Sequence, residues 1–330
     1  MKIQKVGIVG LGSIGRRHLR NLKLVRPEIE ISVVRSGYGP ECIEQNLASY
    51  VFNNLEQAVE EGIQAAIISS PAPEHLRQAT ILSKKGVHLL IEKPLSHNMK
   101  NVAELISTVQ KSGIIGLLGY TLRYDSAAKE FKKNLKEGLT GKLLQVRVEC
   151  GSFLPDWRPN CDYLKSVSSS ADLGGGVLLE LSHELDYIHW FFGPMQSVFA
   201  YLHNSGFLGI DVEESADLLF VRPDDVPISL HMDFNRRHPE RRCVAEGSEG
   251  QLSWNVITRK VKWAPAHQDV EERSFSMESD AAYQSQLLHF FDCIENNVQP
   301  CIELEDGKTV LKWIEAARIS HTTGKRVDLL

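Results

Sequence analysis

Long hydrophobic runs are absent from this chain of 330 residues, and no apolar stretch approaches the roughly 20 residues that span a bilayer. The first residues also lack the separate charged and apolar regions of a secretory signal. We therefore expect a cytoplasmic protein with no membrane partner.

The chain also lacks a large excess of charge of either sign. The sequence holds 37 Lys and Arg against 42 Asp and Glu, a formal net charge of −5, which gives no reason to expect a nucleic-acid partner. The basic run "NRRHPERR" (Asn235–Arg242) is short and contains an acid, so we interpret it as a solvated turn.

Paired cysteines are missing too. The spacing contains no C-x-x-C, which argues against structural zinc and against a disulfide framework. We expect no metal site and interpret the six cysteines as small core or surface residues: Cys42, Cys150, Cys161, Cys243, Cys293 and Cys301.

The length and the hydrophobic content of 42% suit two soluble domains. Strand-like and helix-like segments alternate with short turns in the first part, which predicts a parallel sheet wound on both faces, an α/β architecture. Later, strand-like runs dominate and predict a largely antiparallel sheet with helices on one face. We expect domains over 1–122 and 123–330, a single helix around Val177–Phe192, a hairpin at Gly247–Gly250, and helices over Tyr283–Asn296 and Gly307–Thr322.

The stretch "VGIVGLGSIGRRH" places Gly10, Gly12 and Gly15 in G-x-G-x-x-G spacing between a strand and a helix. The first glycine permits the tight turn, the second lets a pyrophosphate approach the backbone, and the third lets helix and strand pack closely. Ser13 and Ile14 lie just before a helix expected over Gly15–Val25, and the free N–H groups at the start of that helix favour phosphate. The alternative is a glycine-rich turn of some other α/β protein.

The tip of the second strand bears on which dinucleotide binds. NAD sites usually carry Asp or Glu there, whereas this chain has Arg35 and Ser36, which could hold a 2′-phosphate. We therefore favour NADP over NAD. The alternative is a solvated Arg35, with Glu41 or Glu44 reaching the ribose.

Two clusters carry candidate proton-transfer groups. Lys93 ends the fourth predicted strand, where ligands bind in doubly wound sheets, although a solvated turn would also explain it. Glu180, His183 and Glu184 follow a triple glycine at helical spacing i, i+3 and i+4, so a single helix would present them on one face. The alternative there is an exposed charged face.

Together these pieces resemble the glucose–fructose oxidoreductase/inositol dehydrogenase/MocA family of NAD(P)-dependent oxidoreductases. The family implies an N-terminal Rossmann domain and a C-terminal α+β domain with an open, mainly antiparallel sheet, commonly the interface of a homodimer or homotetramer. The resemblance spans nearly the whole chain through "GLGSIGRRH" with His18, "SSPAPEH" (Ser69–His75), "EKPL" (Glu92–Leu95), "GYTLRY" (Gly119–Tyr124), the triple-glycine helix, "EGSEGQL" and Asp306–Ser320.

The resemblance also implies site residues. Lys93 becomes the proton carrier beside the nicotinamide, and His183 its partner, because the family's H-x-x-D spacing survives at 183–186. Two positions depart from the family: Leu179 stands where many members have an aspartate, so Glu180 would take over that role, and Ala72 stands where relatives often have Asn. Further cofactor contacts are expected at Ser70, Pro71, His75 and Glu92.

The segment after the long strand resembles a subgroup of surface-polysaccharide and nucleotide-sugar metabolism. There Trp157 and Tyr163 would stack on a sugar or base, while Arg158 and Lys165 would hold phosphate or carboxylate. Arg123 and Glu184 are further substrate-side candidates. A surface loop with a packed tryptophan is the alternative.

The predicted function is hydride transfer between a nicotinamide and a hydroxyl or ketone carbon of a sugar, sugar acid or nucleotide-sugar. Two alternatives keep the same fold: a glycosidase with tightly bound NAD, and a regulator that senses nucleotide without turnover. Retention of both Lys93 and His183 favours the oxidoreductase.

Overall fold

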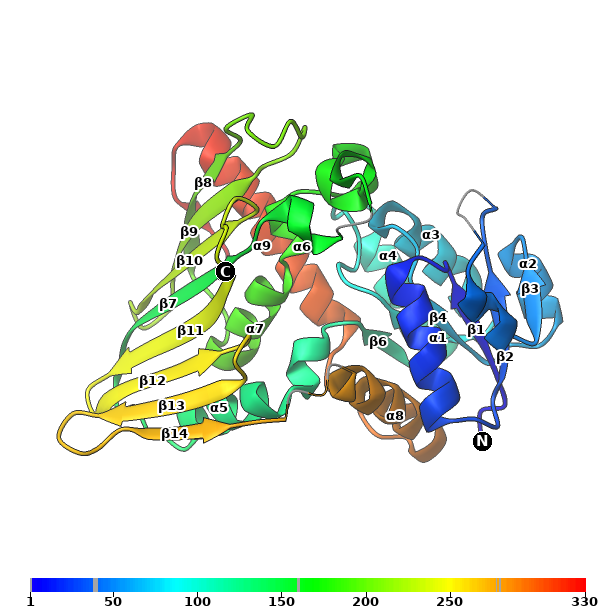
Figure 1. The fold of residues 1–330 in the computed structure, drawn as a ribbon, viewed down its shortest axis with the longest axis horizontal. Helices are drawn as coiled ribbons and strands as arrows, with labels where there is room; N and C mark the ends of the chain where they lie inside the picture. The colour runs from blue at the N-terminus through cyan, green and yellow to red at the C-terminus, as the bar shows by residue number, and fades with distance from the viewer. Residues whose placement is uncertain (1, 38–40, 159–160, 277, 279) are drawn as a thin grey trace. The chain divides into compact units, whose positions relative to one another are not determined.

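The computed structural model describes residues 2–37, 41–158, 161–276, 278 and 280–330. The chain divides into two compact units (Figure 1), of which the first holds Met1–Thr121 and Ser279–Leu311. The second holds Leu122–Glu278 and Lys312–Leu330. The helix after Glu278 therefore packs with the N-terminal segment.

The described residues of the first unit form a six-stranded sheet in the order β3-β2-β1-β4-β5-β6, and neighbouring strands in it run parallel. Its central strands are continuous apolar runs, as expected where both faces of a parallel sheet are covered. The strands are β1 Lys5–Val9, β2 Glu30–Val34, β3 Tyr50–Phe52, β4 Ala65–Ile68, β5 His88–Ile91 and β6 Gly116–Leu118.

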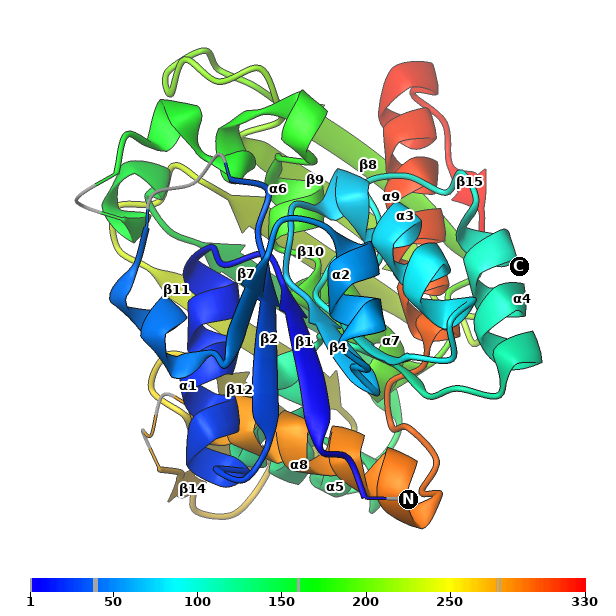
Figure 2. The ribbon, with the colours of Figure 1, turned by 90° about the vertical axis from the view of Figure 1, so that its right-hand side faces the viewer.

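Helices cover both faces of this sheet (Figure 2): α1 and α8 lie on one side, and α2, α3 and α4 on the other. Neither β3 nor α2 was predicted from the sequence; the residues of β3 are largely exposed and show no alternation of buried and exposed positions. The helices are α1 Ser13–Val25, α2 Leu55–Glu60, α3 Ala72–Ser83, α4 Val102–Ser112 and α8 Ala281–Asn296, with the 3₁₀ turn η1 at Ile43–Leu47.

Helix α8 completes the core of this unit although more than 160 residues separate it from β6. Leu287, Phe290 and Phe291 join the apolar cluster formed by α1 and the inner strands. At the rim, Arg26, the C-cap residue of α1, lies over the Phe291 ring at 4.7 Å and donates to the Glu295 carboxylate at 3.0 Å. The α1 face of the sheet is thus closed by a segment distant in sequence.

The described residues of the second unit form a nine-stranded sheet in the order β14-β13-β12-β11-β7-β10-β9-β8-β15. In this sheet β7 and β10 run parallel to each other, and every other described pair of neighbouring strands is antiparallel. The strands are β7 Leu143–Gly151, β8 Ser197–His203, β9 Ser215–Val221, β10 Pro227–Asp233, β11 Glu240–Gly247, β12 Gly250–Asn255, β13 Lys260–Pro265, β14 Glu271–Ser274 and β15 Val327–Asp328.

One face of this sheet packs on helices and the other is open. The buried Trp254 of β12 meets Phe131 and Tyr187 on the covered face. Alternate residues of β8 and β9, such as Phe199 and Leu219, are exposed. The helices are α5 Ser126–Lys136, α6 Val177–Glu180, α7 His183–Phe192 and the end of α9 Leu304–Thr323, with 3₁₀ turns η2 Thr121–Tyr124, η3 Leu154–Trp157, η4 Tyr163–Lys165, η5 Val167–Ser169 and η6 Ala171–Leu173.

The predicted fold class is confirmed: a doubly wound parallel sheet precedes an open, mainly antiparallel one, and Gly247 pairs with Gly250 across the predicted hairpin. The single helix around Val177–Phe192 is wrong, because Leu181 leaves helical geometry at φ −97° and ψ 25° and separates α6 from α7. Within the described residues, no helix combines the length and apolar character that crossing a membrane requires.

Two adjacent leucines of α8 test its place in the first unit. Leu287→Ala, at a fully buried position, should lower the free energy of unfolding by about 2–5 kcal/mol, because it leaves a cavity in the core. Leu288 is 49% exposed, and Leu288→Ala should change the same quantity by about 0.5 kcal/mol or less. Hydrogen exchange of peptides from β1 and α1 is the measurement; equal protection in both variants would contradict the packing described.

Candidate functional site

The turn between β1 and α1 is shaped by three glycines. Gly10 has φ +89°, and a Cβ there would lie 2.8 Å from the Ser70 backbone nitrogen. A Cβ on Gly15 would lie 2.1 Å from the Gly10 carbonyl oxygen. The Ser69 hydroxyl donates to that same carbonyl at 2.8 Å. The turn is therefore pressed against the end of β4 and requires glycine at both positions.

Gly12 differs from the other two. No described atom lies within 4 Å of the Cβ that it would carry, and its φ of −70° is open to any residue. Helix α1 starts next, with Ser13 and Ile14 in a first turn that holds no acidic residue and, among the described residues, no side-chain cap. Open space before uncapped N–H groups fits the pyrophosphate of a dinucleotide.

The tip of β2 holds the residues predicted to choose between NAD and NADP. Arg35 is half-buried, and its guanidinium donates to the Gln45 amide oxygen at 2.5 Å, while Ser36 is exposed. Glu44 pairs with Arg20 of α1 at 2.5 Å, and its pKa is held below the usual value by its backbone hydrogen bond first and then by the charges of Arg16 and Arg20. A carboxylate with this partner is less available to a ribose than the exposed Glu41.

The cofactor contacts predicted after β4 lie at and just before the start of α3. Pro71 is exposed, and the Ser70 hydroxyl donates to Gln78 at 2.6 Å. The buried His75 has its Nδ1 2.9 Å from the Pro94 carbonyl oxygen and its Nε2 2.8 Å from that of Ser70. Burial lowers the pKa of His75, although both carbonyls raise it. The ring joins the ends of β4 and β5.

Glu92 lies in the interior just before Lys93. Its Oε1 accepts from the buried His18 ring at 2.6 Å, and its Oε2 accepts from the Lys93 backbone N–H at 3.2 Å. A Cβ on Gly119 would lie 2.9 Å from the Glu92 Cα, so the residue that follows β6 must be glycine. Lys93 is half-buried and precedes Pro94 through a cis peptide bond. This carboxylate therefore fixes the backbone from which the lysine extends.

Tyr283 is a residue of this region that sequence analysis did not single out. Its ring meets His18 edge to face at 5.7 Å, and Arg17 lies over it at 4.5 Å. Burial and then the Glu92 charge raise the pKa of its hydroxyl. Tyr283 belongs to α8, so no local spacing could have linked it to the glycine turn.

In the second unit, the triple glycine forms the start of α6. Gly176 has φ +94°, and a Cβ there would lie 2.5 Å from the Glu213 carboxylate. That carboxylate accepts from the Leu178 N–H at 3.2 Å, and burial raises its pKa. Glu180 ends α6 and accepts from the Ser168 hydroxyl at 3.0 Å. Sequence analysis identified neither Glu213 nor Ser168.

The break after α6 separates Glu180 from the helix that His183 begins. His183 is half-buried, whereas the next residue, Glu184, is fully buried. Both Glu184 carboxylate oxygens accept from Arg241 of β11, at 2.6 and 3.0 Å. The three residues expected on one helical face are thus distributed over two short helices.

Arg123 forms a second buried pair with the helix. Its guanidinium donates to both oxygens of Asp186 at 2.6–3.1 Å, and the side chains are 5% and 1% exposed. The aspartate of the H-x-x-D spacing therefore anchors α7 to the turn η2.

The segment expected to face substrate consists of short 3₁₀ turns. The Trp157 indole N–H donates to the Ser152 hydroxyl at 2.7 Å, and the Tyr163 hydroxyl donates to the Leu208 carbonyl at 3.0 Å. Arg158 is exposed, and Lys165, with its side chain 84% exposed, lies 3.7 Å from Asp162. Both aromatic side chains hold the segment in place, while both cations face solvent.

The basic run at 235–242 is neutralised within its own unit. Arg236 pairs with Glu149 and Glu240, and Arg242 pairs with the same two carboxylates, at 2.8–3.1 Å. Among the described residues, no group of three His, Cys, Asp or Glu is arranged to hold a metal ion.

Two family models match the chain. The model described as "Oxidoreductase family, NAD-binding Rossmann fold" matches residues 4–120, and the "GFO/IDH/MocA C-terminal domain" matches residues 128–253. The chain belongs to the Gfo/Idh/MocA family of oxidoreductases. The glycine turn before α1 lies within the residues that the NAD-binding Rossmann model matches. It is the turn that we expect to bind the dinucleotide and is called the NAD-binding turn below.

The names of similar proteins refer to an inositol, an anhydrosugar and a UDP-sugar. Myo-inositol 2-dehydrogenase of Thermotoga maritima is 25% identical over 341 residues, covering 98% of both chains. The structure of levoglucosan dehydrogenase in complex with NADH and levoglucosan has a TM-score of 0.89 at 16% identity, covering 99% of both chains. The WlbA dehydrogenase of Bordetella pertussis, in complex with NADH and UDP-GlcNAcA, has a TM-score of 0.83 at 18% identity, covering 100% of this chain and 99% of that one.

The NAD-binding turn is tested by placing a methyl group at two of its glycines. Gly12→Ala should fold normally yet raise the Kd of NADH at least about tenfold, because the methyl occupies the approach of the pyrophosphate. Gly15→Ala should lower the melting temperature, because its Cβ would overlap the Gly10 carbonyl at 2.1 Å. Calorimetry and a fluorescence titration separate these effects; an unchanged Kd for Gly12→Ala would contradict the assignment.

Proposed function

We propose that this oxidoreductase transfers hydride between NAD(P) and a CH–OH or ketone carbon of a sugar, sugar acid or nucleotide-sugar. The observation that carries the proposal is the common sheet edge of two features. The NAD-binding turn follows β1, and Lys93 follows β5, separated by β4 alone in the sheet order. Ligands of doubly wound sheets bind at this carboxyl edge.

The role proposed for Lys93 is proton transfer at the reacting hydroxyl. The nicotinamide, when bound, supplies the hydride chemistry at C4. Glu92 holds the Lys93 backbone N–H while His18 holds Glu92, so the lysine stem leaves a fixed point. A half-buried amine at such a point can accept the hydroxyl proton during oxidation and return it during reduction.

His183 is proposed as the second acid/base group, with Glu180 as its orienting carboxylate. The support for Glu180 is its fixed carboxylate, which accepts a hydrogen bond from Ser168 at the end of α6, three residues before α7 begins. Arg123 and Glu184 are proposed to position α7 through their buried ion pairs with Asp186 and Arg241. Their roles would be indirect, through the helix that carries His183.

On the substrate side, we assign sugar contact to Trp157 and Tyr163, and recognition of phosphate or carboxylate to Arg158 and Lys165. The exposure of both cations supports this assignment, since each can reach a ligand without leaving a buried partner. An acidic or phosphorylated sugar would suit them better than a neutral polyol.

For the cofactor, NADP is favoured over NAD. Arg35 and Ser36 stand at the tip of β2 in place of an acid, and Glu44 is engaged by Arg20. Because the Gln45 amide is neutral, its hydrogen bond with Arg35 leaves the full positive charge of the guanidinium at the tip of β2. The proposed contacts after β4 are Ser70, Pro71 and His75.

A homodimer or homotetramer through the open face of the second sheet is also proposed. Large apolar side chains are exposed on β7, β8 and β9: Leu144, Phe199, Tyr201 and Leu219.

A spectrophotometric screen tests the reaction itself. Purified protein is incubated with NADP or NAD and a panel of inositols, anhydrosugars, sugar acids and nucleotide-sugars, and nicotinamide reduction is followed. Reduction that depends on one member of the panel supports the proposal. Binding of dinucleotide with no turnover across the panel, or glycoside cleavage without net reduction, would favour one of the other functions of this fold.

With a substrate in hand, Lys93→Met tests the proton carrier. The variant should lose at least about 100-fold in kcat, the typical scale of acid–base catalysis, and should keep the wild-type Kd for the dinucleotide. Lys100→Met, at an exposed position of the same segment, is the matched control and should retain wild-type kcat. Near-normal turnover by Lys93→Met would remove the lysine from the mechanism.

Cofactor preference is tested at Arg35. Wild-type protein should bind NADPH more tightly than NADH, and Arg35→Ala should weaken NADPH about 10–100-fold, since a hydrogen bond to a charged group contributes about 1.5–3 kcal/mol. Binding of NADH should change little. Arg77→Ala, which removes an exposed arginine of α3, is the control. Tighter binding of NADH by the wild type would show that NAD is the cofactor.

A further inference from the structure

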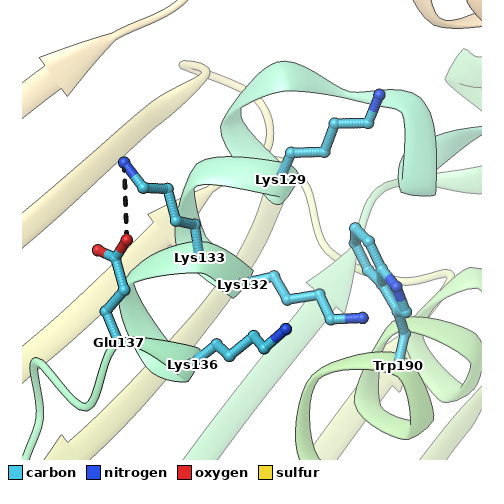
Figure 3. Close-up of a pocket in the computed structure, with 6 residues that line it drawn as sticks. All are labelled: Lys129, Lys132, Lys133, Lys136, Glu137 and Trp190. Atoms are coloured by element: carbon cyan, nitrogen blue, oxygen red, sulfur yellow. Dashed lines mark ion pairs between the residues drawn. The ribbon is translucent and has the colours of Figure 1, made fainter.

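Helix α5 borders a cavity that none of the assigned site residues line. The cavity has a volume of about 520 Å³, within the range of small-ligand pockets, and lies wholly in the second unit (Figure 3). Its lining comes from α5 and from Trp190 of α7: Lys129, Lys132, Lys133, Lys136, Glu137 and Trp190.

The lysines are not equivalent. In Figure 3, Lys132 and Lys136 extend toward the indole of Trp190 and Lys129 lies on the same side of the helix, whereas Lys133 points away. The Lys133 ammonium pairs with Glu137 at 3.9 Å, so the carboxylate in the lining is engaged on the far side. The Lys132 ammonium lies 4.4 Å from the centre of the indole ring.

Helix electrostatics explain only part of this pattern. Lysines in the last turn, here Lys133 and Lys136, favour the negative end of the helix dipole. Lys129 and Lys132 lie earlier, and like charges at spacings of three and four residues destabilise a helix. The chain as a whole carries a net charge of −5, so a cationic stripe beside an aromatic ring is not its general surface character.

We propose that the α5 groove, formed by Lys129, Lys132, Lys136 and Trp190, binds the nucleoside diphosphate portion of a small ligand. The base would stack on the indole, as bases do on aromatic side chains. Lys132 and Lys136 stand about one helical turn apart, so their ammonium groups can hold neighbouring phosphates. The long stem of Lys132 lets its ammonium leave the ring for the phosphate when the base arrives.

This site is separate from the NAD-binding turn, which belongs to the first unit. The proposed binding does not depend on the proposed reaction, because no residue of the α5 groove has been given a role in that reaction. Phosphate recognition by lysine and stacking by tryptophan are sufficient for binding without any catalytic group.

The probe is UDP, titrated calorimetrically into protein that is saturated with its dinucleotide so that the Rossmann turn is occupied. Lys132→Gln/Lys136→Gln should weaken one equivalent of UDP at least about tenfold, a loss of about 1.4 kcal/mol. Lys133→Gln removes an equal charge per residue on the other side of α5 and should leave the Kd within about twofold. Inorganic pyrophosphate, which lacks a base, should bind more weakly than UDP.

A second readout locates the ligand. In protein labelled at its five tryptophans, the indole signal of Trp190, assigned through Trp190→Phe, should shift on addition of UDP and not in the double lysine variant. The proposal is wrong if UDP binds equally to wild type and double variant, if Lys133→Gln weakens it as much, or if the Trp190 signal does not move. It is also wrong if the lysine variants alter sedimentation rather than UDP affinity, since the groove would then contact another protein chain.

Discussion

The first unit depends on one buried negative charge. Glu92 is 5% exposed, and a carboxylate there is tolerable only if its oxygens are hydrogen-bonded. His18 supplies one bond from α1 and the Lys93 backbone supplies the other, so a single side chain joins the helix after the NAD-binding turn to the strand that carries the lysine. Removing the His18 ring would leave a buried oxygen of Glu92 without its hydrogen bond, which is more costly than losing one surface ion pair. This carboxylate thus connects the helix that follows the glycine turn with the backbone of Lys93.

That coupling could be predicted only in part. The glycines, Glu92 and Lys93 follow apolar strands within a few residues, so local spacing was sufficient to find them and to recognise a parallel sheet. Tyr283 approaches the same histidine from α8. An amphipathic helix reveals that it has a buried face but not which sheet covers it. Only the folded chain shows Leu287 and Phe290 in the core of the first unit.

The second unit shows a different limit of sequence reasoning. Helical spacing assumes one continuous helix, and Leu181 interrupts it, so the i, i+3 relation of Glu180 and His183 does not survive. Residues outside the segment contact both helices. The Glu213 carboxylate lies where Gly176 would carry a side chain and accepts from the Leu178 N–H of α6, while Arg241 and Arg123 pair with Glu184 and Asp186 of α7.

These ion pairs also explain why charged residues near a site need not touch ligand. Arg123 and Glu184 carry the charges that sequence patterns associate with recognition, yet both are fully engaged in the interior. Lys132 and Lys136 do not indicate a binding site in the sequence, because lysine-rich helix faces are common on protein surfaces. Trp190 lies some 55 residues further along the chain. In the folded protein it lines the same groove, and the Lys132 ammonium lies over its ring. Charge type is readable from sequence, whereas the partner that determines what the charge does is a property of packing.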